Sequence, residues 1–163
     1  MHWLENGVLC RRLLPIFFLV LSWIPVAAAR DVAVISNKSN RLGSVTLAEL
    51  VKVCKGQMNH WTDGKPVTFV MLDPTTPEMK IVLQKVYEMT PDEVRTLITT
   101  ANHGRTNHPA IVVVASDEEA VQKVQSMPGA VGVVDVYSIT GSVVVLKVAG
   151  KSPLEQGYLL HGN

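Results

Sequence analysis

Short, nearly uninterrupted apolar runs alternate along this chain with stretches in which apolar residues recur at helical spacing. The runs at Val32–Ile35, Val67–Leu72 and Val131–Tyr137 predict strands, because a short continuous apolar run is typical of a strand buried on both faces. Two further runs, Ala110–Ala115 and Val143–Val148, predict strands as well. Strands that alternate with helices favour an α/β domain with a mainly parallel sheet flanked by helices.

Helix start signals precede the stretches with helical spacing. They are the T-x-x-E capping boxes Thr46–Glu49 and Thr90–Glu93, the proline Pro77, and the segment Ser116–Glu119. A different signal separates the last two strands, where Thr140-Gly141 is typical of a tight turn. We therefore expect these two strands to pair as a C-terminal antiparallel hairpin.

The N-terminal segment has the order of features found in a secretory signal peptide. Arg11-Arg12 precedes the apolar run Leu13–Val26, and Ala27–Ala29 supplies the small residues that signal peptidase requires. A transmembrane anchor is the alternative, but the run is short for the roughly 20 residues of a membrane span. We expect residues 1–29 to be removed, and a domain of residues 30–163 to be periplasmic or secreted.

Charge and cysteine content narrow the classes of protein further. Cleavage after position 29 of 163 would leave 134 residues, enough for one domain with a hydrophobic core. Loss of Arg11, Arg12 and Glu5 would reduce the 15 basic and 14 acidic side chains to 13 of each, and a neutral domain offers no electrostatic footprint for nucleic acid. Cys54 would remain as the only cysteine, and its place on an apolar helix face favours a buried, inert thiol over a reactive one.

Two segments stand out as a pair. The first is Leu47–Gly56 followed by His60-Trp-Thr-Asp-Gly64, and the second is Val121–Asp135, which contains Pro128-Gly-Ala-Val-Gly132. In this order and spacing they resemble the substrate-binding proteins of phosphate ABC transporters, which show "L..L..IF.G...W.DG.P" and later "V...PGAIGYV". The segment Val32–Asn40 and the chain ending are similar to further patterns of that family, so the resemblance runs from about Val32 to Leu160.

The resemblance implies a fold and a single-lobe form. The fold is a type 2 periplasmic-binding-protein-like lobe, with a mainly parallel sheet between helices. Family members place another oxyanion-binding loop in a lobe that precedes the region similar to this chain. The resemblance therefore implies a short, single-lobe relative rather than a two-lobed clamp.

The resemblance also points to one loop as a ligand site. The family's oxyanion motif "R.DGSGT" falls on Met71 to Pro77, with Asp73 at the Asp, Thr75 at the Ser, Thr76 at the second Gly and Pro77 at the Thr. Two hydroxyls are present, the Arg is replaced by Met71, and Pro77 lacks an N–H donor. Either Thr75 and Thr76 hold an oxyanion at a helix N-terminus, or they only cap that helix.

Three further residues complete the candidate ligand site. Ser36 and Asn37 follow a strand expected beside the Thr75 and Thr76 loop, and ligands in open α/β sheets collect at the carboxyl ends of strands. Arg105, in the polar loop between Asn102 and Pro109, is the most plausible cation for a small anion, with a solvated surface arginine as the alternative.

No other chemistry has a pattern behind it. The loop histidines His60, His103 and His108 have no helical i, i+4 spacing and no recognised carboxylate partner, so no metal is predicted, and no cofactor either. No G-x-S-x-G nucleophile motif occurs, so an enzyme is not expected.

Two hypotheses of function follow. The first is an extracytoplasmic protein that binds phosphate or a similar small oxyanion for an ABC transporter or for phosphate sensing, with the transporter's membrane component or a second copy of the chain as partners. The second is a lobe without a ligand that serves as an interaction module in a cell-envelope complex.

Overall fold

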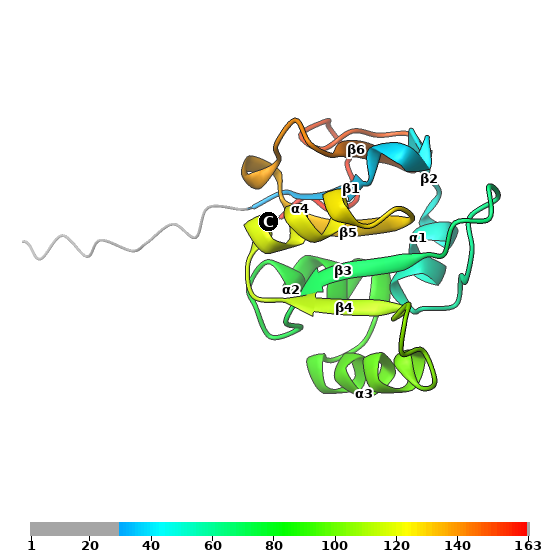
Figure 1. Ribbon diagram of the computed structural model, residues 1–163. Coiled ribbons are helices and arrows are strands. Elements are labelled where there is room, and N and C mark those ends of the chain that lie inside the picture. Colours follow the sequence, from blue (N-terminus) through cyan, green and yellow to red (C-terminus); the bar gives the residue numbers. More distant parts are fainter. Residues whose placement is uncertain (1–29, 163) are drawn as a thin grey trace, which may run out of the picture.

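A single six-stranded sheet organises the protein (Figure 1). The computed structural model describes residues 30–162, and the predicted signal peptide lies outside them. The strands follow the spatial order β2-β6-β1-β5-β3-β4. Their bounds are Val32–Ser36 (β1), Ser44–Val45 (β2), Thr68–Leu72 (β3), Ile111–Val114 (β4), Ala130–Asp135 (β5) and Val144–Val148 (β6).

Four α-helices accompany the sheet in the described residues. They are Leu47–Cys54 (α1), Met79–Val82 (α2), Pro91–Asn102 (α3) and Asp117–Ser126 (α4). A π-helical turn, Leu83–Tyr87, continues α2. Both predicted capping boxes form, at the starts of α1 and α3, so the mixed α/β class and these helix starts are confirmed.

The sheet is mostly parallel. Three of its five strand pairs are parallel, namely β2 with β6, β3 with β5 and β3 with β4. The exception is β1, which runs antiparallel to both of its neighbours, β5 and β6. The predicted mainly parallel sheet is therefore confirmed, with one strand of opposite direction in its middle.

The predicted C-terminal hairpin is wrong. β5 and β6 are not paired, because β1 lies between them, with Val34 opposite Val133 on one side and Leu146 on the other. All five residues of β1 are buried, so both of its edges need a strand. The chain leaves β5 through the 3-10 turn Val136–Ser138, crosses β1 and re-enters the sheet in the same direction.

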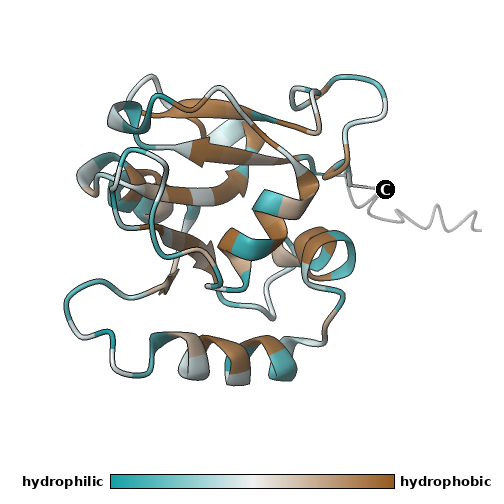
Figure 2. Cartoon of the chain, turned by 90° about the vertical axis from the view of Figure 1, so that its right-hand side faces the viewer, coloured by the Kyte–Doolittle hydropathy of each residue, from teal (hydrophilic) through white to brown (hydrophobic). Residues whose placement is uncertain are grey.

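Helices cover both faces of the sheet, as expected. On one face, α1 and α2 pack through Leu50, Val53 and Val82 against strand residues such as Phe69 and Val131. On the other face, α4 packs through residues that include Val121 and Val124, against Ile35, Val70 and Val134. Figure 2 shows the apolar strands enclosed between these helices. The alternation of side chains along each strand supplies both apolar layers.

The helix α3 is the exception to this layering. It lies at the bottom of Figures 1 and 2, beyond the edge strand β4, and Val94 is its only buried residue. Within residues 30–162, no helix combines the length and apolarity needed to cross a membrane.

The direction of β1 defines two ends of the sheet. Val32 lies opposite Asp135, and Ser36 lies opposite Val131. The carboxyl ends of β3, β4 and β5 are therefore at the end where β1 begins, which we call the Asp31 end. Their amino ends are where β1 finishes, which we call the Asn37 end.

Candidate functional site

The segments that carry the family resemblance meet at the Asn37 end. The Trp61 indole N–H donates to the Gly129 carbonyl oxygen at 2.8 Å, and the Gly129 N–H donates to Asn40 Oδ1 at 2.7 Å. A Cβ atom at Gly129 would lie 1.9 Å from the Pro66 carbonyl oxygen. The pattern that resembles the family therefore builds a structural junction between β1, β3 and β5.

Ser36 and Asn37 belong to the same junction. Asn37 donates from Nδ2 to the carbonyl oxygens of Val124 and Gln125, at 2.9 and 2.8 Å, and so caps the last turn of α4. Its Oδ1 accepts from the Ser39 N–H at 2.8 Å. Ser36 is fully buried and accepts from Asn40 Nδ2 at 2.9 Å. Both side chains therefore use their hydrogen-bonding groups to stabilise the fold.

The predicted grouping of Ser36 and Asn37 with Thr75 and Thr76 is wrong. The loop Asp73–Pro77 follows β3 and lies at the Asp31 end, whereas Ser36 and Asn37 lie at the opposite end. The prediction assumed that β1 runs parallel to β3. A short apolar run predicts a strand but does not indicate its direction. The antiparallel direction of β1 could therefore not be predicted from the sequence.

The loop after β3 satisfies its own hydrogen-bonding groups. Asp73 Oδ1 accepts from the Thr75 N–H at 2.9 Å and from the Thr75 hydroxyl at 2.5 Å, while the Thr76 hydroxyl donates to the Asp73 carbonyl oxygen at 2.9 Å. Arg95 Nη2 lies 3.0 Å from Asp73 Oδ1. The hydrogen bonds from Thr75, followed by the Arg95 charge, lower the pKa of Asp73. Anion binding by Thr75 and Thr76 stays a prediction, and it requires these bonds to be exchanged.

Carboxylates gather near this loop at the Asp31 end. Arg30 lies 3.0 Å from Glu78 Oε1 and 3.8 Å from Asp135 Oδ2. Asp117 accepts from the Asp135 N–H at 3.3 Å and from the Ser138 hydroxyl at 3.2 Å. Burial raises the pKa of Asp117, and the charges of Asp135 and Glu78 raise it further. The negative charges around Asp117 therefore oppose an added anion next to them.

Arg105 lies away from both groups. It is in the connection between α3 and β4, at the amino end of β4, and donates from Nη2 to Asn59 Oδ1. Because β4 runs parallel to β3, Arg105 is at the Asn37 end and cannot replace the Arg that the family motif has at Met71. The five candidate residues therefore do not form one site in the structure. Arg105 is also not near Thr75 and Thr76.

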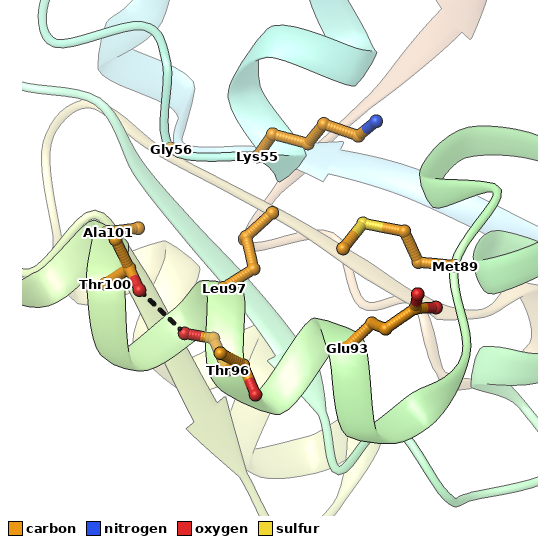
Figure 3. A pocket seen from close by; sticks show the side chains of 8 residues that line it. All are labelled: Lys55, Gly56, Met89, Glu93, Thr96, Leu97, Thr100 and Ala101. Carbon is orange, nitrogen blue, oxygen red and sulfur yellow. Dashed lines mark hydrogen bonds between the residues drawn. The ribbon is translucent and has the colours of Figure 1, made fainter.

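Two apolar hollows lie next to the segment that leads into α3. One, of about 510 Å³, lies between the end of α1 and α3, where Leu97 and Met89 point toward the space and the Lys55 side chain runs along the opposite wall (Figure 3). The other, of about 540 Å³, lies beside the Asp73–Pro77 loop and shares Met89 with the first. Neither hollow presents a catalytic set.

Within the described chain, no three His, Cys, Asp or Glu side chains are grouped so that they could hold a metal ion. Cys54 is fully buried, as predicted, and burial raises the pKa of its thiol well above the ordinary value. Its sulfur is therefore kept from solvent and in the protonated form.

Comparison with known proteins gives a match in structure and none in sequence. No protein-family model matches this chain, and no curated protein does. Among solved structures, an ABC-type phosphate transport receptor from Vibrio cholerae superposes with a TM-score of 0.66 at 17% identity, over 82% of this chain and 54% of the receptor. The chain shares the fold of the matched part of this receptor.

Other solved structures agree. PstS from Borrelia burgdorferi gives a TM-score of 0.63 at 16% identity, over 83% of this chain and 55% of its own. A phosphate ABC transporter substrate-binding protein from Clostridium perfringens, solved with bound phosphate, gives 0.60 at 16% identity, over 76% and 47%. The chain spans about half the length of these proteins. The resemblance noted in the sequence is thus matched by the fold of one such lobe.

Proposed function

We propose that this protein is an extracytoplasmic recognition module with the architecture of a substrate-binding lobe, and that its partner is a component of the cell envelope. The signal-like segment at residues 1–29 supports a position outside the cytoplasm. The fold supports a binding role, because proteins with this fold include transport receptors. Fold alone does not assign a ligand, so the choice between ligands rests on the site.

The observation that carries this proposal is the closed hydrogen-bonding of the Asp73–Pro77 loop. The Asp73 carboxylate accepts hydrogen bonds from the Thr75 hydroxyl and N–H, and the Asp73 carbonyl oxygen accepts one from the Thr76 hydroxyl. An entering oxyanion would have to displace a carboxylate from these donors and then lie close to it. Pro77 supplies no N–H, and Glu78 follows directly. This loop therefore favours contact with a larger partner over capture of free phosphate.

Binding of phosphate or a similar small oxyanion is the second candidate, for uptake by an ABC transporter or for sensing. It is favoured by the fold shared with the phosphate-bound protein from Clostridium perfringens. In this alternative Asp73 turns away and Thr75 and Thr76 hold the ion. One lobe covers only one side of an ion, so a second copy or another chain would have to close over it.

A residue-resolved phosphate titration separates the two candidates. Amide signals of Thr75, Thr76 and Glu78 to Lys80 in ¹⁵N-labelled exported protein should not move as inorganic phosphate is added up to millimolar concentration, because the hydroxyls stay with Asp73. Saturable shifts there that disappear in the Thr75→Val/Thr76→Val double variant, but persist in Thr99→Val, would establish the second candidate instead. Thr99 is a matched control because it is exposed on α3 and its hydroxyl donates to the Arg95 carbonyl, away from the Asp73–Pro77 loop.

The recognition role has its own measurement. Chemical cross-linking in intact cells of the producing organism should yield one defined complex of higher mass that contains this protein and another envelope component. Recovery of the protein only as an uncross-linked monomer, under conditions that capture known envelope complexes, would contradict the proposal.

A further inference from the structure

A hollow at the Asn37 end has a more polar lining than the two hollows next to Met89. It has a volume of about 480 Å³ and is lined by polar side chains from two separate segments, together with Pro66 and Gly104. The polar members are Asn59, His60, Arg105, Thr106, Asn107 and His108. We call this hollow the Arg105 pocket.

The lining of the Arg105 pocket is rich in hydrogen-bond donors and free of carboxylates. A guanidinium, two imidazoles, two amides and a hydroxyl surround it, and no Asp or Glu is among its lining residues. At the Asp31 end, by contrast, the arginines are paired with carboxylates: Arg30 lies beside Glu78 and Asp135, and Arg95 lies beside Asp73. An anion is therefore accommodated far better in the Arg105 pocket than beside the Asp73–Pro77 loop.

The arginine in this pocket is positioned but not neutralised. Arg105 is half-buried, and its one side-chain hydrogen bond within residues 30–162 is to the neutral Asn59 amide oxygen. Arg30 and Arg95, by contrast, each lie against carboxylates. A guanidinium has five N–H donors, so most of those on Arg105 remain for a ligand. Asn59 thus fixes the side chain while its charge stays available.

The size of the pocket indicates more than a free ion. The hollow is open to solvent, and its volume of about 480 Å³ leaves room beside Arg105 for more than one tetrahedral oxyanion. The imidazoles of His60 and His108 and the amides of Asn59 and Asn107 could bind hydroxyl groups next to the anion. These features fit a polar organic molecule that carries one charged oxyanion group.

We propose that the Arg105 pocket binds a small organic molecule through a phosphate or sulfate group, with Arg105 as the main contact of that group. The inference goes beyond the proposed recognition role, because it assigns a small-molecule ligand to one surface of the module. The site is at the amino ends of β3 and β4, at the opposite end of the sheet from the Asp73–Pro77 loop.

The test uses glucose 6-phosphate, glucose, inorganic phosphate and inorganic sulfate as probes of the ¹⁵N-labelled exported protein. Glucose 6-phosphate should shift the amide signals of Gly104 to His108 and of His60, and should bind at least several-fold more tightly than either inorganic ion. Glucose should not bind measurably. Equal affinity for inorganic phosphate and glucose 6-phosphate would overturn the organic part of the proposal, and shifts confined to other regions would overturn the site.

Matched variants test the role of Arg105. Arg105→Gln should weaken glucose 6-phosphate binding by about tenfold or more, because a charge-assisted hydrogen bond is lost. His108→Gln should weaken it less, and Arg41→Gln should leave it unchanged, since Arg41 is an exposed arginine that does not line the pocket.

Unchanged affinity in Arg105→Gln, with a spectrum that otherwise matches the parent, would overturn the proposal. A cross-linked envelope complex that persists in that case would leave the recognition role standing and reject only this pocket.

Discussion

Buried and partly buried amide side chains in this protein form hydrogen bonds with backbone groups that helices and strands leave unpaired. The Asn37 side-chain amide donates hydrogen bonds to two carbonyl oxygens at the end of α4. Asn102 donates to the Ile111 carbonyl at 2.7 Å and accepts from the Ile111 N–H at 3.0 Å, which imitates a neighbouring strand at the edge of β4. From the sequence alone, Asn37 is equally suited to a ligand, because an amide offers the same donors to an ion and to a helix end.

Tyr87 offers a direct measurement of such a contact. Its hydroxyl is buried and donates to the Cys54 carbonyl oxygen at 2.8 Å, at the end of α1. Tyr87→Phe leaves that oxygen without this donor, so the free energy of unfolding should fall by about 1–3 kcal/mol. Urea denaturation should show a lower midpoint with an unchanged slope. Tyr137→Phe is the control, since Tyr137 is 84% exposed and its change should be negligible. Equal midpoints for the two variants would show that the buried bond contributes nothing.

Helix starts are predictable in this chain because their signals are local. Each capping box is a pair of residues three apart, and both form as the sequence indicates. The positions of strands are also indicated, since burial on both faces requires apolar runs. The partner and direction of a strand are not local properties. The turn at Thr140-Gly141 is therefore correctly marked by the sequence, whereas the predicted pairing across it is not.

The capping box at the start of α1 predicts a pH dependence. The Thr46 N–H and hydroxyl both donate to Glu49 Oε2 at 2.8 Å, and these bonds lower the pKa of Glu49 below its usual 4.5. A carboxylate whose pKa is lowered in the folded state stabilises the folded state at pH values above its unfolded-state pKa. This stabilisation is lost as the pH falls through the folded-state pKa.

Glu49→Gln should therefore be less stable than the parent at pH 7, by at most about 1 kcal/mol because the group is solvent-exposed. Urea titrations at pH 7, 5 and 3 should show the difference shrinking toward low pH, and a constant difference would contradict this assignment.

At the scale of the whole molecule, the class and layering of the fold are predictable, and the candidate site is not. Strand burial and helix periodicity are enough to indicate an α/β lobe. The five candidate site residues depend on which ends of which strands lie together, and the reversed direction of β1 separates Ser36 and Asn37 from Thr75 and Thr76. The pattern that resembles a ligand-binding family contributes mainly to the junction of β1, β3 and β5. A sequence pattern of this kind can therefore report on architecture without assigning a ligand.

This junction predicts that the fold does not tolerate a side chain at Gly129. Gly129 has a φ of +89°, and a Cβ atom there would lie 1.9 Å from the Pro66 carbonyl oxygen. Its N–H and carbonyl also bind Asn40 and Trp61. Gly129→Ala must therefore move the backbone before β3 away from the start of β5, and should reduce the free energy of unfolding by about 3 kcal/mol or more, or prevent folding. Gly141→Ala is the matched control, because a Cβ atom at Gly141 meets nothing within 4 Å. Urea denaturation followed by circular dichroism should show a normal midpoint for Gly141→Ala and a strongly lowered one for Gly129→Ala. If both variants unfold at the parent midpoint, the contacts between these three strands do not hold the lobe together as described.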